Sequence, residues 1–581
     1  LRATQTVPFF YNPIRVNGKY LFDGGVYNNF PVDVVQEVFN PDVVLGVNVS
    51  TKIYNDYPYD LDEKLISNSL LFLLLDKSDP ASVPQNGVYI QPDLGGYTSF
   101  DFSRAKSLID SGYIQTLRQI DEIRAKVGAR RSCDDVTERR NRFNNRNPQL
   151  VFDKVTFKGF NQKQSRYLQQ IFHYNPSHPK PLYYNGIKKS YFRLVSEQYF
   201  NNVYPNILFD SASNRFQFQL IRRPQKNFQV DFGGVIASRD ISNIFLGLNF
   251  YSFNKRLLHA YAGFHTGNFY KSALLKARVD FPFQAYIEPV AEFNSWDYLA
   301  NDDLINDSDA PTVLKRISRN YGVHIGWPIG NLFRNTVGIE GINNIDRYSN
   351  NPVFISTDTL DRLNLTGFKT EIAFTANTLN RKQYASSGKA YRIAAQYFNL
   401  RENLDPGTTS VITEHVSAYR QWFRLKASAE QYFNAGWFRP GYYVEGVFSN
   451  QEFLHNYKGT LVNAPAFLPL QDSRTLLLEN FRAFNYLAGG VKNVFSIRNK
   501  LDFRLEGYLF KPIDPLKQNV EQKPYTTTDL QALYFAASAG LVLHSPIGPI
   551  ALNANYYDDS ENRFGVLLHV GFLLYNRHAI E

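Results

Sequence analysis

The chain has 581 residues, 63 basic against 53 acidic side chains and a formal net charge of +10. Its 44% apolar content excludes a disordered chain, its single Cys excludes a disulfide-stapled fold, and its length predicts several domains. The charge does not indicate nucleic-acid binding, because the basic residues alternate with apolar ones in short runs and accompany no recognition motif.

Residues 1–127 are predicted to form a mixed α and β unit. Val43–Val49 is a nearly continuous β-branched run, typical of a strand buried on both faces. Apolar residues recur at helical spacing through Ser103–Val127, which predicts a helix. The apolar run Leu70–Leu75 is interpreted as a core helix, with contact to a membrane as the alternative. The polar stretch 128–149 predicts a linker. The basic stretch Arg124–Arg146 is interpreted as solvated, with a position near anionic lipid headgroups as the alternative.

Residues 150–223 show a β-α-α-β-β pattern. An alternating apolar run at Phe152–Phe157 predicts an opening strand, and helical spacing follows at Gln162–Phe172 and Asn185–Phe200. Two alternating runs between Ile207 and Leu220 predict a closing hairpin. The length suits one small module.

From Asn227 to Glu581 the chain consists of strand-length alternating runs separated by Asn, Asp, Gly, Pro and Ser. In one of them Leu501, Phe503, Leu505, Gly507 and Leu509 alternate with Asp502, Arg504, Glu506 and Tyr508. A soluble sandwich would also alternate, so the alternation alone does not decide the fold.

Three further features favour a transmembrane β-barrel. The runs are about 9–13 residues long, as a tilted strand needs to cross a bilayer. Full charges recur on the second face, which suits a watery lumen and would disrupt a dry core. Aromatic residues stand at the run ends, as in membrane-interface girdles: Tyr270, Trp296, Tyr298, Trp327, Trp422, Trp437 and Tyr575. We predict about sixteen antiparallel strands in a closed barrel over 227–581.

The first 32 residues carry the strongest motif. Asp23-Gly24-Gly25 follows a segment with Pro and aromatic residues and precedes Asn29-Phe30-Pro31. Asp-Gly-Gly alone is more often a structural turn. The whole constellation resembles the C-terminal half of a patatin-like phospholipase domain.

That resemblance implies a Ser–Asp dyad on an α/β scaffold, in which Asp23 is the base and Gly24 and Gly25 support the turn beside it. The family's nucleophile lies in Gly-x-Ser-x-Gly near a glycine-rich oxyanion loop, and this chain contains neither. The chain begins with Leu1 and contains no Met. We therefore expect only the C-terminal half of the domain here, incomplete and inactive by itself, with the nucleophile upstream.

The remaining chain has a second resemblance. Residues 150–223 resemble a POTRA domain, and 227–581 resemble the sixteen-stranded barrel of the BamA/surface-antigen superfamily. In that family the loop after the eleventh strand, here Ser449–Phe484, folds back into the lumen and pairs an Arg with an acidic residue. Arg482 matches that Arg. Glu506 is the expected partner and Asp502 the second candidate.

Two hypotheses follow for the parent protein. The first is a patatin-like phospholipase carried by its own POTRA and barrel modules in the outer membrane of a Gram-negative bacterium. Its substrate would be a phospholipid or lysophospholipid, with no metal or cofactor. The alternative is a BamA-type assembly or translocation factor with an inactive patatin remnant; a plain pore ranks third. Outer-membrane lipids and the assembly machinery are the expected partners, and the N-terminal domains are periplasmic or surface-exposed.

Overall fold

The computed structural model divides the chain into two compact units, Leu1–Asn147 and Pro148–Glu581. It describes residues 2–7, 11–16, 18–49, 80–94, 104–128, 131–200, 202–223, 226–298, 314–351, 355, 357–433, 436–498, 500–528, 531–560 and 562–580. The predicted helix at Leu70–Leu75 lies outside these ranges. Within them, no helix combines the length and hydrophobicity needed to cross a membrane.

The first unit combines short strands with helices. Its elements are η1 (Ala3–Gln5), β1 (Ile14–Val16), β2 (Lys19–Leu21), η2 (Gly24–Val26), α1 (Val32–Phe39), β3 (Leu45–Val47), η4 (Pro80–Ser82), β4 (Val88–Ile90), α3 (Ala105–Arg118), α4 (Ile120–Lys126) and α5 (Cys133–Asn144). Strands β1 and β2 form an antiparallel hairpin, and β3 pairs in parallel with β4.

The predicted strand at Val43–Val49 is therefore shorter than expected, and the predicted helix at Ser103–Val127 is divided at Gln119. The predicted linker also contains a helix, α5, whose Ser132 side chain accepts the Asp135 amide as an N-cap. All of its side chains are exposed. Polar composition thus identified solvent exposure correctly but not backbone conformation.

Between the linker and the barrel, the chain forms a four-stranded sheet with two α-helices, which we call the module. Its elements are β5 (Val151–Lys158), α6 (Gln162–Ile171), β6 (Leu182–Tyr183), α7 (Tyr184–Ser196), η6 (Gln198–Phe200), β7 (Val203–Asp210) and β8 (Arg215–Arg222), with sheet order β6-β5-β8-β7. Asn161 and Gln164 form a capping box that starts α6. Phe152, Leu168 and Leu220 are fully buried at its centre.

The module packs directly on the barrel hairpin formed by β10 (Asn243–Phe253) and β11 (Leu257–Gly267). Tyr251, Phe253 and Leu257 of that hairpin belong to the same hydrophobic core as the module. The Gln164 side chain donates to the Phe253 carbonyl at 2.7 Å, and Arg278 lies 3.3 Å from Glu197. The module and barrel therefore share one packed interface.

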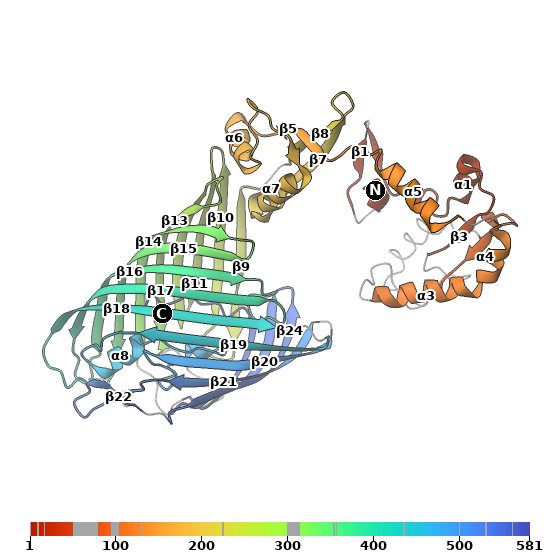
Figure 1. The fold of residues 1–581 in the computed structure, drawn as a ribbon. Helices are drawn as coiled ribbons and strands as arrows, with labels where there is room; N and C mark the ends of the chain where they lie inside the picture. Colours follow the sequence, from red (N-terminus) through yellow and green to blue (C-terminus); the bar gives the residue numbers. More distant parts are fainter. Residues whose placement is uncertain are drawn as a thin grey trace. The chain divides into compact units, whose positions relative to one another are not determined.

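Among the described residues, sixteen antiparallel strands close into a barrel (Figure 1). They are β9 (Phe228–Ala237), β10 (Asn243–Phe253), β11 (Leu257–Gly267), β12 (Tyr270–Asp280), β13 (Tyr286–Asp297), β14 (Leu314–Ile329), β15 (Phe333–Tyr348), β16 (Asp361–Asn377), β17 (Lys389–Asp405), β18 (Val416–Tyr432), β19 (Phe438–Ser449), β20 (Tyr486–Arg498), β21 (Leu501–Pro512), β24 (Tyr534–Ser545), β25 (Gly548–Tyr557) and β26 (Phe564–Gly571). A separate short hairpin, β22 (Leu516–Gln518) and β23 (Pro524–Thr526), lies between β21 and β24.

The two faces of the wall differ as the alternation predicts. On β21, Leu505 and Leu509 point outward and are about half exposed, whereas Arg504 and Glu506 point inward and are buried. The closed ladder leaves backbone groups paired within the wall, and the outward face is apolar, which suggests an outer-membrane location.

The expected aromatic girdle is only partly present. Trp327 and Trp437 point outward and are exposed. Tyr270, Trp296 and Trp422 are instead buried inside the barrel, where Trp422 stacks on Phe398 with ring centroids 4.8 Å apart. An aromatic residue at a strand end suits either face of the wall, so its position in the sequence did not reveal its direction.

The outward face of β17 changes from apolar to polar along the strand. Ile393 and Tyr397 occupy its first part, and Asn399, Arg401 and Asn403 follow at alternate positions. The neighbouring strands are polar at the same level: Asn403 opposes Asn364 on β16 and Ser417 on β18. The polar region is therefore continuous across these strands.

The barrel closes at a short seam between β9 and β26. The described residues give three paired positions there, from His569–Ala237 to Gly571–Val235, whereas β25 and β26 pair over seven. Strand β26 ends at Gly571, four residues before Tyr575, where we expected the last strand to end. Gly571 has φ +102°, and a Cβ there would lie 2.1 Å from the Gly234 carbonyl oxygen. This conformation turns the chain out of the wall.

Candidate functional site

Asp23 lies in the tight connection between β2 and η2. Its backbone N–H donates to the Thr6 carbonyl at 3.1 Å, and Thr6 is itself buried. Its Oδ1 accepts the Gly25 N–H at 2.8 Å as the N-cap of η2. Asp23 is thus held through its backbone N–H and through one carboxylate oxygen, while its side chain remains partly accessible.

The two glycines beside Asp23 are not equivalent. A Cβ at Gly25 would lie 2.7 Å from Asn29 Oδ1 and 3.1 Å from Asp23 Oδ1, whereas a Cβ at Gly24 would meet nothing within 4 Å. A side chain at position 25 would therefore displace the Asn29 amide and crowd the Asp23 carboxylate. A carboxylate fixed by one amide can use its other oxygen to accept a proton, as a general base must.

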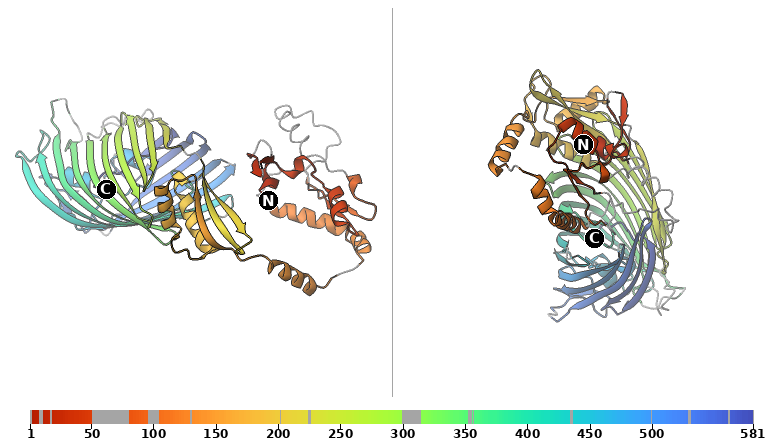
Figure 2. Two further views of the ribbon diagram at one scale, coloured as in Figure 1. Left: turned by 90° about the horizontal axis from the view of Figure 1, so that it is seen from above. Right: turned by 90° about the vertical axis from the view of Figure 1, so that its right-hand side faces the viewer.

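The loop between β19 and β20, residues 450–485, fills part of the barrel lumen, and we call it the plug loop. It contains α8 (Tyr457–Asn463) and η8 (Ser473–Thr475), and most of its side chains are buried. Its bounds match the predicted loop, Ser449–Phe484, to within a residue. The strands that surround it are visible in the further views of the barrel (Figure 2).

Buried polar contacts anchor the plug loop to the wall. Asp346 Oδ1 lies 2.9 Å from Arg316 Nε, and Asp346 Oδ2 accepts from Asn463 Nδ2 of α8 at 2.8 Å. Arg316 Nη2 also donates to Asn463 Oδ1 at 3.1 Å. These three groups satisfy one another in a triangle, which fixes α8 against β14 and β15.

A second anchor joins the plug loop to both sides of the seam. Asp472 Oδ2 lies 3.1 Å from Arg239 Nη1, in the β9–β10 connection, and both side chains are almost fully buried. Asp472 Oδ1 accepts from the Tyr557 hydroxyl of β25 at 2.6 Å. The Asp472 carboxylate thus connects β25, which pairs with β26, to the turn that follows β9.

The structure does not bring Arg482 to Glu506. Arg482 Nη1 donates to the Val462 carbonyl at 3.0 Å and to the Ala464 carbonyl at 3.5 Å, both within the plug loop. Glu506 is instead bound by Arg504 at 2.9 Å and by the Tyr508 hydroxyl at 2.6 Å. The expected pair was wrong because residues two apart on a strand share one face, so Glu506 finds its partners on its own strand.

The second candidate, Asp502, also has other partners. Its carboxylate lies 2.8 Å from His544 Nε2 and 3.5 Å from Arg381 Nη1, and it accepts from the Ser496 hydroxyl at 2.9 Å. Arg482 therefore closes the plug loop upon itself, while Glu506 and Asp502 stabilise the wall.

Two lumenal elements were missed from the sequence. The β16–β17 turn, residues 378–388, places Tyr384 deep inside the barrel, where its hydroxyl lies 2.7 Å from His569 Nε2 of β26. The segment after β26 also enters the lumen. A turn longer than a tight hairpin and a glycine inside an apolar run were the available signals.

Replacing Arg482 by Ala is expected to lower the free energy of unfolding by about 1–3 kcal/mol, because two buried carbonyls lose a charged donor. The measurement is the midpoint of urea unfolding in detergent. Arg498→Ala, at an exposed position on β20, is the matched control and should leave the midpoint nearly unchanged. Equal midpoints for both variants would contradict a structural role for Arg482.

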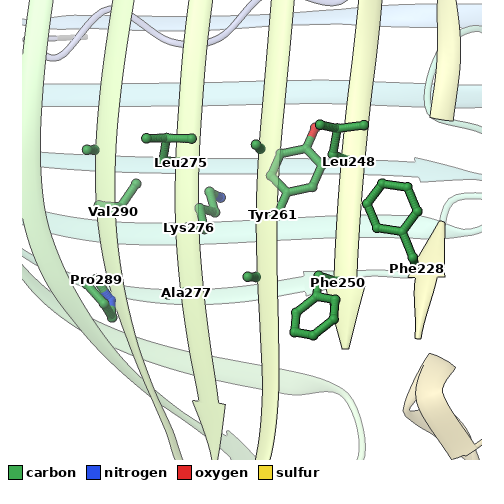
Figure 3. A pocket seen from close by; sticks show the side chains of 12 residues that line it. Phe228, Leu248, Phe250, Tyr261, Leu275, Lys276, Ala277, Pro289 and Val290 are labelled. Carbon is green, nitrogen blue, oxygen red and sulfur yellow. The ribbon is translucent and has the colours of Figure 1, made fainter. Parts of the chain in front are cut away.

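A shallow depression of about 440 Å³ lies on the wall over β9–β13 (Figure 3). Phe250, Ala260 and Ala277 are directly opposite one another on three successive strands. The small alanine side chains leave the depression beside the larger Phe250. The outward-facing side chains that form it are hydrocarbon, which can pack against lipid but cannot perform catalysis.

Among the described residues, no group of three or more His, Cys, Asp or Glu side chains is arranged to hold a metal ion. A family model for patatin-like phospholipases matches residues 1–35. The chain is also 28% identical over 94 residues to Probable lipid hydrolase 463L of Invertebrate iridescent virus 6, covering 12% of this chain and 32% of the relative. The chain thus spans about a third of that curated relative's length.

Two solved barrels are similar to the chain. BamA from Haemophilus ducreyi lacking POTRA domains 1–3 is 11% identical with a TM-score of 0.47, covering 73% of this chain and 85% of that chain. CdiB from Acinetobacter baumannii is 8% identical with a TM-score of 0.42, covering 73% of this chain and 74% of that chain.

Proposed function

We propose that this chain is part of an outer-membrane patatin-like phospholipase, in which Asp23 is the base of a Ser–Asp dyad. The observation that carries the proposal is the turn at Asp23, Gly24 and Gly25, which lies inside the segment matched by the patatin-like phospholipase model. There the Asp23 carboxylate accepts the Gly25 N–H, and a side chain at position 25 would crowd that carboxylate.

In this proposal Asp23 takes the proton of a serine hydroxyl supplied upstream of this chain, as the serine oxygen attacks the ester carbonyl of a phospholipid or lysophospholipid. The acyl group passes to serine and the alcohol leaves with a proton. Water then attacks the acyl-serine and loses its proton to Asp23; the bond between the acyl carbon and the serine oxygen breaks, the fatty acid leaves, and the serine oxygen takes the proton back from Asp23. The substrates are constituents of membranes, so a barrel anchor would hold the enzyme beside its supply.

Assembly or translocation is the second candidate function, because the module at 150–223 and the barrel share one hydrophobic core. A single-purpose anchor would not need that shared interface. In this alternative, the 150–223 module is a POTRA domain that receives client polypeptides, and the patatin segment is inactive.

Lipid hydrolysis and labelling of the nucleophilic serine distinguish the two candidate functions. Full-length protein in detergent micelles should hydrolyse fluorogenic phospholipids and lysophospholipids, and a fluorophosphonate probe should label it covalently at the nucleophilic serine. Heat-denatured protein is the control for both readouts. Absence of turnover together with absence of labelling in folded full-length protein would overturn the enzyme proposal and favour the second candidate.

A further inference from the structure

The segment that follows β26, Phe572–Ile580, leaves the barrel wall. Strand β26 ends at Gly571, where positive φ redirects the chain, and the Phe572 N–H makes a last bond to β9 by donating to the Gly234 carbonyl at 3.1 Å. Leu573, His578, Ala579 and Ile580 are all buried. The next polar contact is the Leu573 N–H, which donates to Gln383 Oε1 of the β16–β17 turn at 3.1 Å. The chain therefore enters the lumen directly behind the seam.

The middle of the segment is recognised by β12 and β13. The Asn576 N–H donates to the Tyr270 hydroxyl at 3.0 Å, and its side-chain amide donates to Asn294 Oδ1 at 3.2 Å. Tyr575 packs edge-on against Tyr270 with ring centroids 5.1 Å apart. Both the backbone and the side chains of the segment thus have specific partners.

Cationic side chains of the far wall bind the last part of the segment. Lys369 Nζ of β16 donates to the Ala579 carbonyl at 3.3 Å. Arg424 Nη1 of β18 donates to the Ile580 carbonyl, and Ala579 and Ile580 join a buried apolar cluster with Trp422. Donation by Lys and Arg to main-chain carbonyls recognises an extended peptide backbone together with its apolar side chains.

We propose that the barrel lumen contains a peptide-binding groove crossing from β12 to β18, whose occupant is this chain's own segment Phe572–Ile580. The groove recognises the peptide by hydrogen bonds to its backbone and by apolar pockets for Ala579 and Ile580. Bound there, the segment closes the remaining lumenal space beside the plug loop. It also keeps the chain after β26 from pairing with the residues of β9 that precede Gly234.

Cysteine labelling in the intact chain tests this proposal. In a Cys133→Ser background, which removes an exposed thiol, Ala579→Cys reports whether position 579 is accessible to a membrane-impermeant maleimide. We expect slow labelling, and adding Lys369→Gln or Arg424→Gln should accelerate it about tenfold or more, because each removes a charged hydrogen bond. Lys492→Gln is the matched control: this lumenal lysine pairs with Glu430 at 2.7 Å and should leave the rate unchanged.

Ion conductance in planar bilayers gives an independent readout. Deleting residues 573–580 should raise the conductance of the barrel, and a synthetic peptide of residues 573–580 should lower it again, whereas a scrambled peptide should not. The proposal would be overturned if the Ala579→Cys variant is labelled at the rate of a free thiol. It would also be overturned if Lys369→Gln, Arg424→Gln and Lys492→Gln all give the same labelling rate. If the deletion variant does not fold, the labelling rates in the intact chain decide the question.

Discussion

Replacing Asp23 by Asn in the full-length protein is expected to reduce phospholipid turnover by about a hundredfold to ten-thousandfold, the usual contribution of a general base. Asn keeps an oxygen that can accept the Gly25 N–H, so the 2.8 Å hydrogen bond that holds the turn should persist. Only the capacity to accept the serine proton is lost. The turnover number on a fluorogenic phospholipid is the quantity to compare.

Asp33→Asn is the matched control for this variant. Asp33 lies on nearby α1, is exposed, and accepts a hydrogen bond from the Asn28 amide at 2.8 Å, which lowers the pKa of its carboxyl. The substitution removes the same carboxylate charge, but at a position outside the turn formed by Asp23, Gly24 and Gly25. Turnover that falls equally in both variants, or in neither, would remove Asp23 from the mechanism even if the wild-type protein is an active hydrolase.

The second large effect is expected at the anchor of α8. Asp346→Ala should lower the free energy of unfolding by about 3–5 kcal/mol, because it leaves the Arg316 guanidinium buried without its carboxylate. The Arg316 and Asp346 side chains are only 7% and 1% exposed, so water cannot replace the lost partner. The Asn463 amide of the plug loop loses one of its two acceptors as well and keeps the Gly459 carbonyl.

Asp405→Ala provides the comparison for the same substitution at an exposed ion pair. Asp405 lies 2.7 Å from His415, and both side chains are more than half exposed. Its removal should cost at most about 1 kcal/mol. The midpoints of urea unfolding in detergent measure both effects. A small shift for Asp346→Ala, comparable to that of Asp405→Ala, would show that the plug loop is held by other contacts.

The strand pattern was predictable because each barrel strand has one face toward lipid and one toward the lumen. A period of two survives even where the residue types vary, as on β21 with its Arg504 and Glu506. The plug loop was predictable for the complementary reason. Residues 450–485 lack the alternation of apolar and polar side chains over a stretch much longer than a hairpin turn.

Contacts inside the lumen were not predictable in the same way. The partner of Arg482 depends on how the plug loop folds upon itself, which no local period records. The end of β26 was placed too late because Phe572–Tyr575 remains apolar after the strand stops. Its direction is decided by the backbone conformation of Gly571, which the surrounding side chains do not reveal.

At the Asp23 turn, the sequence motif pointed to the position and the structure added the reason for it. The motif could not tell which of the two glycines has close neighbours. That depends on the approach of Asn29 Oδ1 to Gly25, a contact made across η2. Whether Asp23 acts as a base remains a prediction for the turnover measurements.

The strands of the barrel differ in length, and this difference fixes how the barrel sits in a bilayer. Strands β9–β13 have 10 to 12 residues, whereas β14–β18 have 16 or 17. At ~3.3 Å per residue and a tilt of ~40°, these lengths correspond to ~28 Å and ~40 Å of height. A hydrocarbon layer of ~30 Å matches only the shorter side. On the taller side, acyl chains should end near Tyr397, and Arg401 should lie among headgroups or in water, so the rim of the cylinder stands higher on one flank than on the other.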